Sequence, residues 1–393
     1  MRIEALSLAD ARRALLSAVR SLPPEEVPLP EASGRIVQRT IVARVSLPPE
    51  DHATVDGYAV RVGDVVGSQG KGLRLAGTVT AGLTAPPPLL PGHCMAITTG
   101  APVPPGTEAV VPLEATRRTG DVVQVASPPL AGSGIRKAGE EAQAGDVLIL
   151  PGTLVQPRTL ERLAAQGITQ VPVSRQARVR VIATGDELVP PGQVPGLAQR
   201  VASNLPMLEA LVRAGGGYLE RGVVVPDDPV QLREALAEAV TCDLLITVGG
   251  TLHGSKDLTK AALAGIGAVF LFDGVAIRPG ASCAAATVWN AAVVCLPGSP
   301  GAAYLGFAAL GRPLLRALHG WTSPIPAFTA RLVEPLPPAA EETVLVAGVV
   351  QETAAGLEFH RRGQGWPALG MLGPSPAGSK PDPHITVEFF PQE

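Results

Sequence analysis

The sequence predicts a multidomain protein in which a doubly wound α/β domain is combined with β-rich domains. The chain has 393 residues, a length typical of several domains. Between residues 178 and 319, continuous apolar segments alternate with helical patterns, as in a parallel sheet covered on both faces. Between residues 30 and 150, and again after residue 321, short Val-rich runs are separated by Gly and Pro, which favours short strands.

Composition excludes several classes of protein. With 46% hydrophobic residues, 17% charged residues and a net charge of −3, the chain is neither disordered nor basic enough to suggest nucleic-acid binding. No apolar run approaches the ~20 residues that span a bilayer, so no membrane partner is expected. The four cysteines are widely separated and form no CxxC pair, which indicates buried thiols in a reducing compartment. The first residues lack the apolar segment of a signal peptide, so we expect a cytoplasmic protein.

The first half of the chain begins and ends with helical patterns. Ser7 and Asp10 form a variant capping box before apolar residues at helical spacing, and this helix ends near Pro23. A second helix is expected over 157–167, with Gly167 at its end. Short strands are expected between the two helices, over residues 42–45, 73–79, 109–112, 121–126 and 147–150.

The α/β segment shows three apolar strands and three helices. Strands are expected over 178–183, 243–248 and 291–296, and helices over 205–214, from 228 to about 240, and over 257–264. Either Ser203 or Asn204 should cap the first helix, and Asp228 precedes a proline that suits the first position of the second. Three further strands are expected near the C-terminus, over residues 328–333, 343–350 and 384–390.

Three strand ends in this segment carry glycine-rich loops. The loops cover 184–187, 249–254 and 297–300, and ligands of open α/β sheets bind at this edge. Glycine lets backbone N–H groups approach an anion closely, which favours a phosphate-bearing ligand. No Walker A or complete G-x-G-x-x-G sequence is present.

Carboxylates follow the same strands. Asp186 and Glu187 follow the first strand, Asp227 and Asp228 lie in another loop, and Asp257 opens a helix. One or two such groups, with phosphate oxygens and water, suit Mg²⁺. The alternatives are that Asp228 and Asp257 are helix caps and that Asp186 and Glu187 belong to a solvated loop.

Several motifs resemble the molybdopterin molybdenumtransferases, the molybdenum insertases that include the E domain of gephyrin, and the chain is identified as a divergent member of that family. The motifs occur in order along nearly the whole chain, at residues 51–60, 98–106, 134–141, 183–188, 203–204, 249–257, 278–280 and 296–300. The resemblance implies four domains: a split helical, elongated domain (1–45 and 146–176), an inserted β-rich domain (46–145), an α/β molybdopterin-binding domain (177–322) and a C-terminal β-barrel (323–393).

The resemblance also implies the reaction and its participants. The substrates are adenylylated molybdopterin and molybdate; with Mg²⁺ the adenylate is hydrolysed, and AMP and molybdenum cofactor are released. A homodimer is implied, with each active site formed by the third domain of one subunit and the second domain of the other. A further partner is the protein that adenylylates the pterin.

Site residues are carried over motif by motif. The catalytic residues implied are Glu187, Asp228, Asp257, Asp56 and Thr99. The metal-binding residues implied are Asp186, Glu187, Asp228 and Asp257. The residues that bind the pterin nucleotide or the oxyanion are Thr184, Gly185, Asp186, Asn204, Gly249, Gly250, Gly254, Arg278, Pro297, Gly298, Ser299 and Arg136.

Departures from the family pattern define the alternative function. A Lys-Pro-Gly-Lys stretch is replaced by Arg278-Pro279-Gly280-Ala281, which changes one cation and removes the other. Leu252 and Trp366 each stand where the family has serine. The alternative is therefore a non-catalytic paralogue that binds pterin without inserting metal. A hydrolase related to amidases of nicotinamide nucleotide salvage is disfavoured by Asp56-Gly57-Tyr58 in a β-rich N-terminal half.

Overall fold

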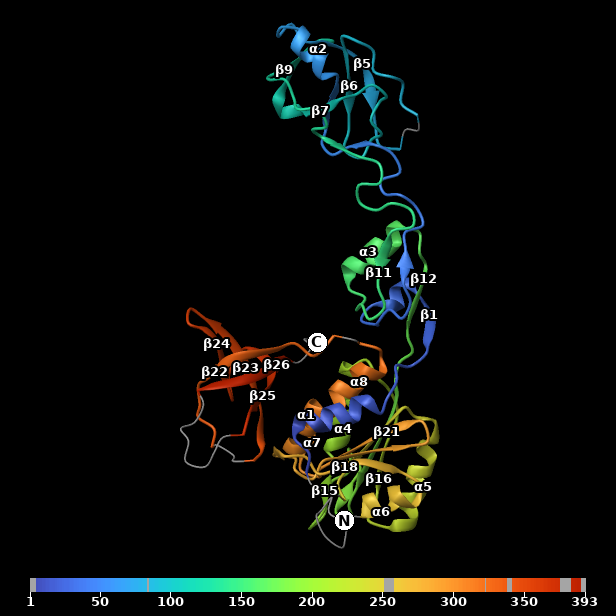
Figure 1. Ribbon diagram of the computed structural model, residues 1–393, viewed down its shortest axis with the longest axis vertical. Helices are drawn as coiled ribbons and strands as arrows, with labels where there is room; N and C mark the ends of the chain where they lie inside the picture. The colour runs from blue at the N-terminus through green and yellow to red at the C-terminus, as the bar shows by residue number, and fades with distance from the viewer. Residues whose placement is uncertain are drawn as a thin grey trace. The chain divides into compact units, whose positions relative to one another are not determined.

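A computed structural model gives the structure of the protein and describes residues 5–82, 85–250, 258–321, 323–337, 341–374 and 383–389 (Figure 1). Contacts divide the chain into two compact units. The smaller unit contains residues 40–150 and 161–169, and the larger unit contains the remainder.

The smaller unit is built around a six-stranded sheet with the order β7-β4-β6-β5-β9-β8. Its strands are β4 (Gly57–Val60), β5 (Leu73–Val79), β6 (His93–Ile97), β7 (Ala109–Pro112), β8 (Thr116–Thr119) and β9 (Val122–Val125), with helix α2 (Val62–Gly67) between β4 and β5. Two short antiparallel pairs complete it: β3 (His52–Ala53) with β10 (Ile135–Arg136), and β2 (Ile41–Val42) with β11 (Val147–Ile149). This unit is β-rich, as the short Val-rich runs predict.

The larger unit contains the predicted α/β sheet, whose six strands have the order β16-β13-β17-β21-β20-β18. The strands are β13 (Arg178–Thr184), β16 (Tyr218–Val225), β17 (Leu244–Val248), β18 (Val269–Asp273), β20 (Ala284–Val288) and β21 (Ala291–Leu296). The first four in spatial order are parallel, and β20 is antiparallel to both of its neighbours. The sheet is therefore mixed, because β20 and β21 are joined by a tight turn instead of a helix.

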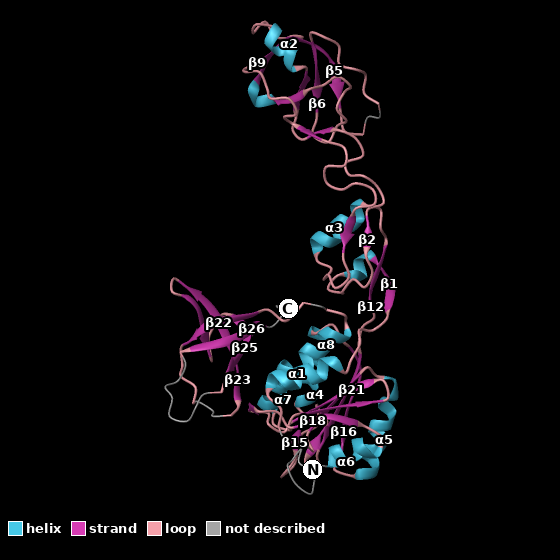
Figure 2. Cartoon of the chain, viewed as in Figure 1, coloured by secondary structure: helices cyan, strands magenta, loops and turns pink. Residues whose placement is uncertain are grey.

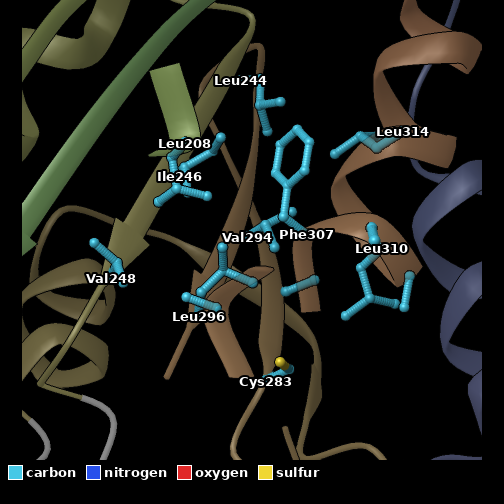
Figure 3. Packing of buried hydrophobic residues seen from close by; sticks show 14 of the residues in the cluster. Leu208, Leu244, Ile246, Val248, Cys283, Val294, Leu296, Phe307, Leu310 and Leu314 are labelled. Atoms are coloured by element: carbon cyan, nitrogen blue, oxygen red, sulfur yellow. The ribbon is translucent and has the colours of Figure 1, made fainter. Parts of the chain in front are cut away.

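Helices cover both faces of this sheet (Figures 1 and 2). One face carries α1 (Leu8–Ser17), α4 (Asn204–Ala214), and α7 (Pro300–Gly306), which continues through the π-helical turn η4 (Phe307–Gly311) into α8 (Arg312–Leu318). The other carries α5 (Pro229–Ala237), the 3₁₀ turn η3 (Glu238–Thr241) and α6 (Leu258–Gly265). Figure 3 shows the first core, in which Phe307, Leu310 and Leu314 face strand residues Leu244 and Val294. The doubly wound arrangement is confirmed.

Side-chain hydrogen bonds cap two of the described helices for which a cap is predicted, and a third described helix has none. The Ser7 hydroxyl accepts a hydrogen bond from the Asp10 amide, and Asp228 accepts from Val230 and Gln231, so both predicted caps are confirmed. Ser203 precedes α4 but makes no capping hydrogen bond, and Asn204 is already helical. Ser203 therefore occupies the cap position, as one of the two alternatives predicts, but without a side-chain hydrogen bond.

A five-stranded β-barrel follows the α/β domain, as the fold prediction states. Strands β22 (Ala327–Leu332), β23 (Thr343–Thr353), β24 (Gly356–His360), β25 (Trp366–Leu372) and β26 (His384–Phe389) close on themselves through the pairing of β23 with β25. The short β19 (Ile277–Arg278) adds to β23. The predicted boundaries of the four domains stay predictions.

The described residues also form several shorter elements. Strand β1 (Pro24–Pro28) pairs with β12 (Gln170–Ser174), and β14 (Leu188–Val189) pairs with β15 (Arg200–Val201). The 3₁₀ turns η1 (Leu29–Ala32) and η2 (Leu113–Ala115) and helix α3 (Pro157–Ala165) complete the described elements.

The four cysteines are free and buried, which confirms the prediction that they pack as small apolar residues. Burial raises the pKa of the Cys283 thiol to about 12, so that it stays protonated at neutral pH. Among the described residues, no helix is long and apolar enough to cross a membrane.

Candidate functional site

The carboxyl ends of four parallel strands bring most of the predicted binding residues to one edge of the α/β sheet. Strands β13, β16, β17 and β21 end at Thr184, Val225, Val248 and Leu296. Because parallel strands end on the same side, the glycine-rich loops at 185–187, 249–250 and 297–299 meet there. We call this edge the carboxyl edge.

Side chains of two adjacent strand ends are linked by hydrogen bonds. The Thr184 hydroxyl donates to Asp227 Oδ1 at 2.9 Å, and the Asp227 amide donates to Asp186 Oδ1 at 3.0 Å. The Gly185 amide donates to the carbonyl of Val225 at 3.2 Å. The loops after β13 and β16 therefore hold one another in place, and their carboxylates gather at one point.

Gly249 and Gly250 are required by the close approach of neighbouring backbone and side chains. Both have positive φ angles, +95° and +62°. A Cβ at Gly249 would lie 2.3 Å from the carbonyl oxygen of Thr184, and one at Gly250 would lie 2.4 Å from Thr259 Oγ1. Gly249 and Gly250 therefore lie directly against the end of β13 because neither has a side chain.

Asn204 connects α4 to the loop after β21. Its Nδ2 donates to the carbonyl oxygen of Gly298 at 2.7 Å. Its Oδ1 is covered and makes no hydrogen bond within the part of the chain that the structure describes. A buried amide oxygen without a donor is unfavourable, so this atom is an acceptor suited to a ligand N–H or O–H group.

The acidic residues at the edge differ in their surroundings. Asp228 Oδ1 accepts the amides of Val230 and Gln231 at 3.0 and 2.8 Å, so the capping interpretation of Asp228 is confirmed. Glu187 is exposed, and its carboxylate folds back over Gly185, where a Cβ would lie 2.6 Å from Oε2. The carboxylates of Asp186 and Asp227 are exposed to solvent beside it. This end of the sheet therefore has a concentration of hard oxygen donors.

Arg278 lies in the connection between β18 and β20, and this connection is also on the carboxyl edge. The end of β18 and the start of β20 pair at Asp273 and Ala284, and Ala284 pairs with Cys295 near the end of β21. Arg278 is exposed, and its Nη2 donates to the carbonyl oxygen of Pro337 at 3.2 Å. The structure gives no direct contact between Arg278 and the carboxylates above.

The smaller unit brings two further predicted residues into contact. Asp56 ends the segment after β3, and Thr99 lies in the turn after β6. Asp56 Oδ1 accepts from the Thr99 amide at 2.7 Å and from the Thr99 hydroxyl at 2.9 Å. These hydrogen bonds hold the pKa of Asp56 below its ordinary value, so this exposed carboxylate is ionised at neutral pH.

Arg136 is positioned by the short pairing of β10 with β3. It pairs across the two strands with His52 and forms an ion pair with Glu141, with Nη1 and Oε1 2.6 Å apart. The neighbouring Lys137 bonds Asp51 at 2.7 Å, so charged residues of both signs lie along these strands. The structure gives no direct contact from Arg136 to Asp56 or Thr99.

Two predicted residues, Gly254 and Asp257, lie outside the described residues, as do Leu252 and the rest of 251–257. In the part of the chain that is described, no three His, Cys, Asp or Glu side chains form a group that could hold a metal ion. The four-residue metal set therefore stays a prediction.

Asp227 lies at this edge but is absent from the site residues predicted from sequence. The sequence places it beside Asp228, which directly precedes Pro229. In the structure Asp228 faces its own helix, whereas Asp227 contacts Thr184 and Asp186 of the neighbouring loop. The Asp-Asp-Pro sequence contained the signal: the residue before the proline suits the cap, which leaves the other available for the loop.

Two protein-family models match the N-terminal and central parts of the chain. Residues 6–167 match the family described as MoeA N-terminal region (domain I and II), and residues 180–317 match the probable molybdopterin binding domain. Molybdopterin molybdenumtransferase 2 of Mycobacterium tuberculosis is 35% identical over 329 residues, 81% of each chain. Molybdopterin molybdenumtransferase of Haemophilus influenzae is 33% identical over 330 residues, 80% of each chain.

Solved structures with the same fold belong to related proteins. Two crystal structures of molybdopterin biosynthesis MoeA protein from Pyrococcus horikoshii are 28% and 25% identical, with TM-scores of 0.79 and 0.82. They cover 99% and 98% of this chain and all of their own. The chain belongs to the molybdopterin molybdenumtransferase family of molybdenum cofactor biosynthesis.

Proposed function

We propose that the protein inserts molybdate into adenylylated molybdopterin, with Mg²⁺-dependent hydrolysis of the adenylate and release of AMP and molybdenum cofactor. The observation that carries this proposal is the carboxyl edge, which brings Gly249 and Gly250, two residues without side chains, to the same end of the sheet as Asp186, Glu187 and Asp227. Backbone N–H groups bind phosphate oxygens when the backbone can approach them closely. Hydrolysis of a phosphoanhydride also requires that the negative charge of the phosphates is balanced.

The pterin nucleotide would be held by the loops after β13, β17 and β21. Gly249 and Gly250 permit close approach of the phosphates, and the buried Asn204 Oδ1 supplies an acceptor. Residues Thr184, Gly185, Pro297, Gly298 and Ser299 line the same edge. Asn204 and Gly298 are already joined, so both positions are fixed before the ligand arrives.

The carboxylates at the edge are oxygen donors of the type that Mg²⁺ prefers. Asp186 and Asp228 each use Oδ1 to accept backbone amides, and Glu187 is exposed. Together with Asp257, these three residues would hold the ion, which balances phosphate charge when bound. The backbone amides that donate to Asp186 and Asp228 also fix where these two carboxylates lie.

Asp56 and Thr99 would act on the reacting groups from the second subunit of a homodimer. The two hydrogen bonds that Thr99 donates hold the ionised Asp56 carboxylate next to a hydroxyl, a pair that can accept and orient a water proton. Arg136 would steer anions toward this pair. Delivery of the substrate by the pterin-adenylylating protein and a cytoplasmic location belong to the same proposal.

The proposal is tested by incubating the purified protein with adenylylated molybdopterin, Mg²⁺ and molybdate, and measuring AMP and active cofactor. Release of both is expected, and Glu187→Ala should lower AMP release at least about 100-fold. Glu234→Ala, at an exposed position of α5, is the control and should be unchanged. If the wild-type protein binds the pterin but releases no AMP, the non-catalytic alternative replaces this function.

Arg278→Ala should raise the molybdate concentration needed for half-maximal cofactor formation by about tenfold. Ala281 leaves Arg278 as the remaining cation of this stretch, and a guanidinium binds an oxyanion through paired N–H groups. Arg278→Lys should restore part of the affinity because it keeps the charge. An unchanged molybdate dependence in Arg278→Ala removes this residue from the oxyanion site.

A further inference from the structure

A cavity lies in the larger unit, away from the carboxyl edge. It has a volume of about 660 Å³ and is lined by residues 214–216, which lead into the start of β16, and by His319 after α8. His319 Nε2 accepts the amide of Ala177, directly before β13. The cavity is therefore at the amino-terminal edge of the sheet, opposite the strand ends that carry the acidic residues. We call it the amino-edge cavity.

Four arginines line the amino-edge cavity: Arg35, Arg213, Arg312 and Arg316. Arg35 pairs with Glu25, and Arg312 shares Glu388 with Arg12. Arg213 is exposed on α4 and makes no hydrogen bond or ion pair with another described residue. Arg316 donates to the carbonyl oxygen of Ser323 at 3.0 Å and has no ion pair within the described ranges. Two positive charges of this cavity thus lack a carboxylate.

The surrounding groups do not remove this positive charge. Burial, together with the charge of Arg312, lowers the pKa of Arg316 to about 10, which still leaves it protonated at neutral pH. Burial and the charge of Arg35 lower the pKa of His319 to about 4, so the imidazole is neutral there. An anion in the cavity would relieve the repulsion between Arg312 and Arg316.

Aromatic rings lie beside the arginines. The guanidinium of Arg316 lies over the Trp321 ring, 3.4 Å from its centroid. Phe389, from the barrel, lines the cavity and packs against Phe328 with ring centroids 5.4 Å apart. A guanidinium stacked on indole keeps its in-plane N–H groups directed outward, which suits a phosphate, and flat aromatic surfaces suit a base.

We propose that the amino-edge cavity is a second binding site and that it takes a mononucleotide. Arg213 and Arg316, which have no carboxylate partner among the described residues, can balance the two negative charges of a phosphomonoester. A single inorganic oxyanion would leave most of 660 Å³ unfilled, whereas a base and a sugar would occupy it. The Gln176 side chain, which lines the cavity and donates to the carbonyl of Gly216, adds a polar group that can bond a base edge.

The test is a titration of the full-length protein with AMP, adenosine and inorganic phosphate, followed by tryptophan fluorescence. AMP should change the emission saturably, and the change should disappear in Trp321→Phe, because Trp289 and Trp366 do not line the cavity. Adenosine should give no saturable change, and phosphate should bind at least about tenfold more weakly than AMP.

Matched variants locate the site. Arg213→Ala should weaken AMP binding at least about tenfold, and Arg316→Lys, which keeps the charge but loses the fork, should weaken it less. Arg233→Ala removes an exposed arginine of α5 that does not line the cavity and should bind AMP normally. Equal AMP affinity in wild type and Arg213→Ala, or phosphate binding as tightly as AMP, overturns the proposal. No turnover is measured, so the outcome is independent of the proposed reaction.

Discussion

Gly249→Ala is expected to abolish most of the AMP release and to destabilise the larger unit. The added Cβ would lie 2.3 Å from the carbonyl oxygen of Thr184, which is backbone and cannot move without shifting the end of β13. The φ angle of +95° adds about 1–3 kcal/mol of strain for any residue with a Cβ. Displacing this loop by about 1 Å from Thr184 and Asp227 is expected to lower turnover about 100-fold.

AMP release and urea denaturation of the variant check this prediction, with Gly265→Ala as the control. Gly265 is at the end of α6 in the same domain, and a Cβ there would meet nothing within 4 Å. The control should keep wild-type turnover and an equal or higher free energy of unfolding. Normal turnover in Gly249→Ala would show that the ligand does not need this loop.

Glu388→Ala is expected to detach the barrel from the α/β domain. Glu388 is 3% exposed; Oε1 accepts from Arg12 at 2.7 Å, and Oε2 accepts from Arg12 and Arg312 at 3.2 Å each. Removing this carboxylate leaves two guanidinium groups facing each other in a buried position. Loss of one partner of a buried ion pair lowers the free energy of unfolding by about 3–5 kcal/mol.

Hydrogen exchange of the β26 amides measures this effect locally, because a multidomain chain does not unfold in one step. Exchange should accelerate strongly in Glu388→Ala and less in Glu388→Gln, which keeps the size of the side chain. Glu352→Ala, at an exposed position of β23, should exchange as the wild type does. Unchanged β26 protection in Glu388→Ala would mean that other contacts hold the barrel.

Three strands were predicted with their exact bounds from sequence. The predicted strand over 291–296 is β21 residue for residue, and 73–79 and 109–112 are β5 and β7. β21 is buried along its whole length, and Pro297 and Gly298 follow it, so a continuous apolar sequence and its end are visible without tertiary information. Other predicted strands differ from the structure by a few residues at one end or at both ends, as 121–126 does from β9.

The helix formed by α7, η4 and α8 was not predicted. Its sequence contains Gly301, Gly306, Gly311 and Pro313, which interrupt a helical pattern. Tertiary packing reverses that preference: a Cβ at Gly306 would lie 3.0 Å from Cys283 Sγ, and one at Gly311 would lie 2.5 Å from Phe307. The glycines therefore allow close packing of the helix, which sequence propensity alone cannot reveal.

The candidate site was predicted as a set of positions, not as a set of contacts. Motifs identified the strand-end loops and the pair Asp56 and Thr99, whose side chains meet in the structure. They could not show that Asn204 would bond Gly298, or that Asp227 would bond Thr184. Such contacts depend on the order of strands in the sheet, which local sequence does not encode.

The central claim is that each active site combines the acidic carboxyl edge of one subunit with Asp56 of the other, and subunit mixing tests it most directly. Asp56→Ala and Glu187→Ala should each be nearly inactive. When the two variants are co-expressed, random pairing should restore about a quarter of wild-type AMP release, because half of the dimers then carry one intact site. Activity no higher than that of the separate variants, in a preparation shown to contain mixed dimers, would contradict the account.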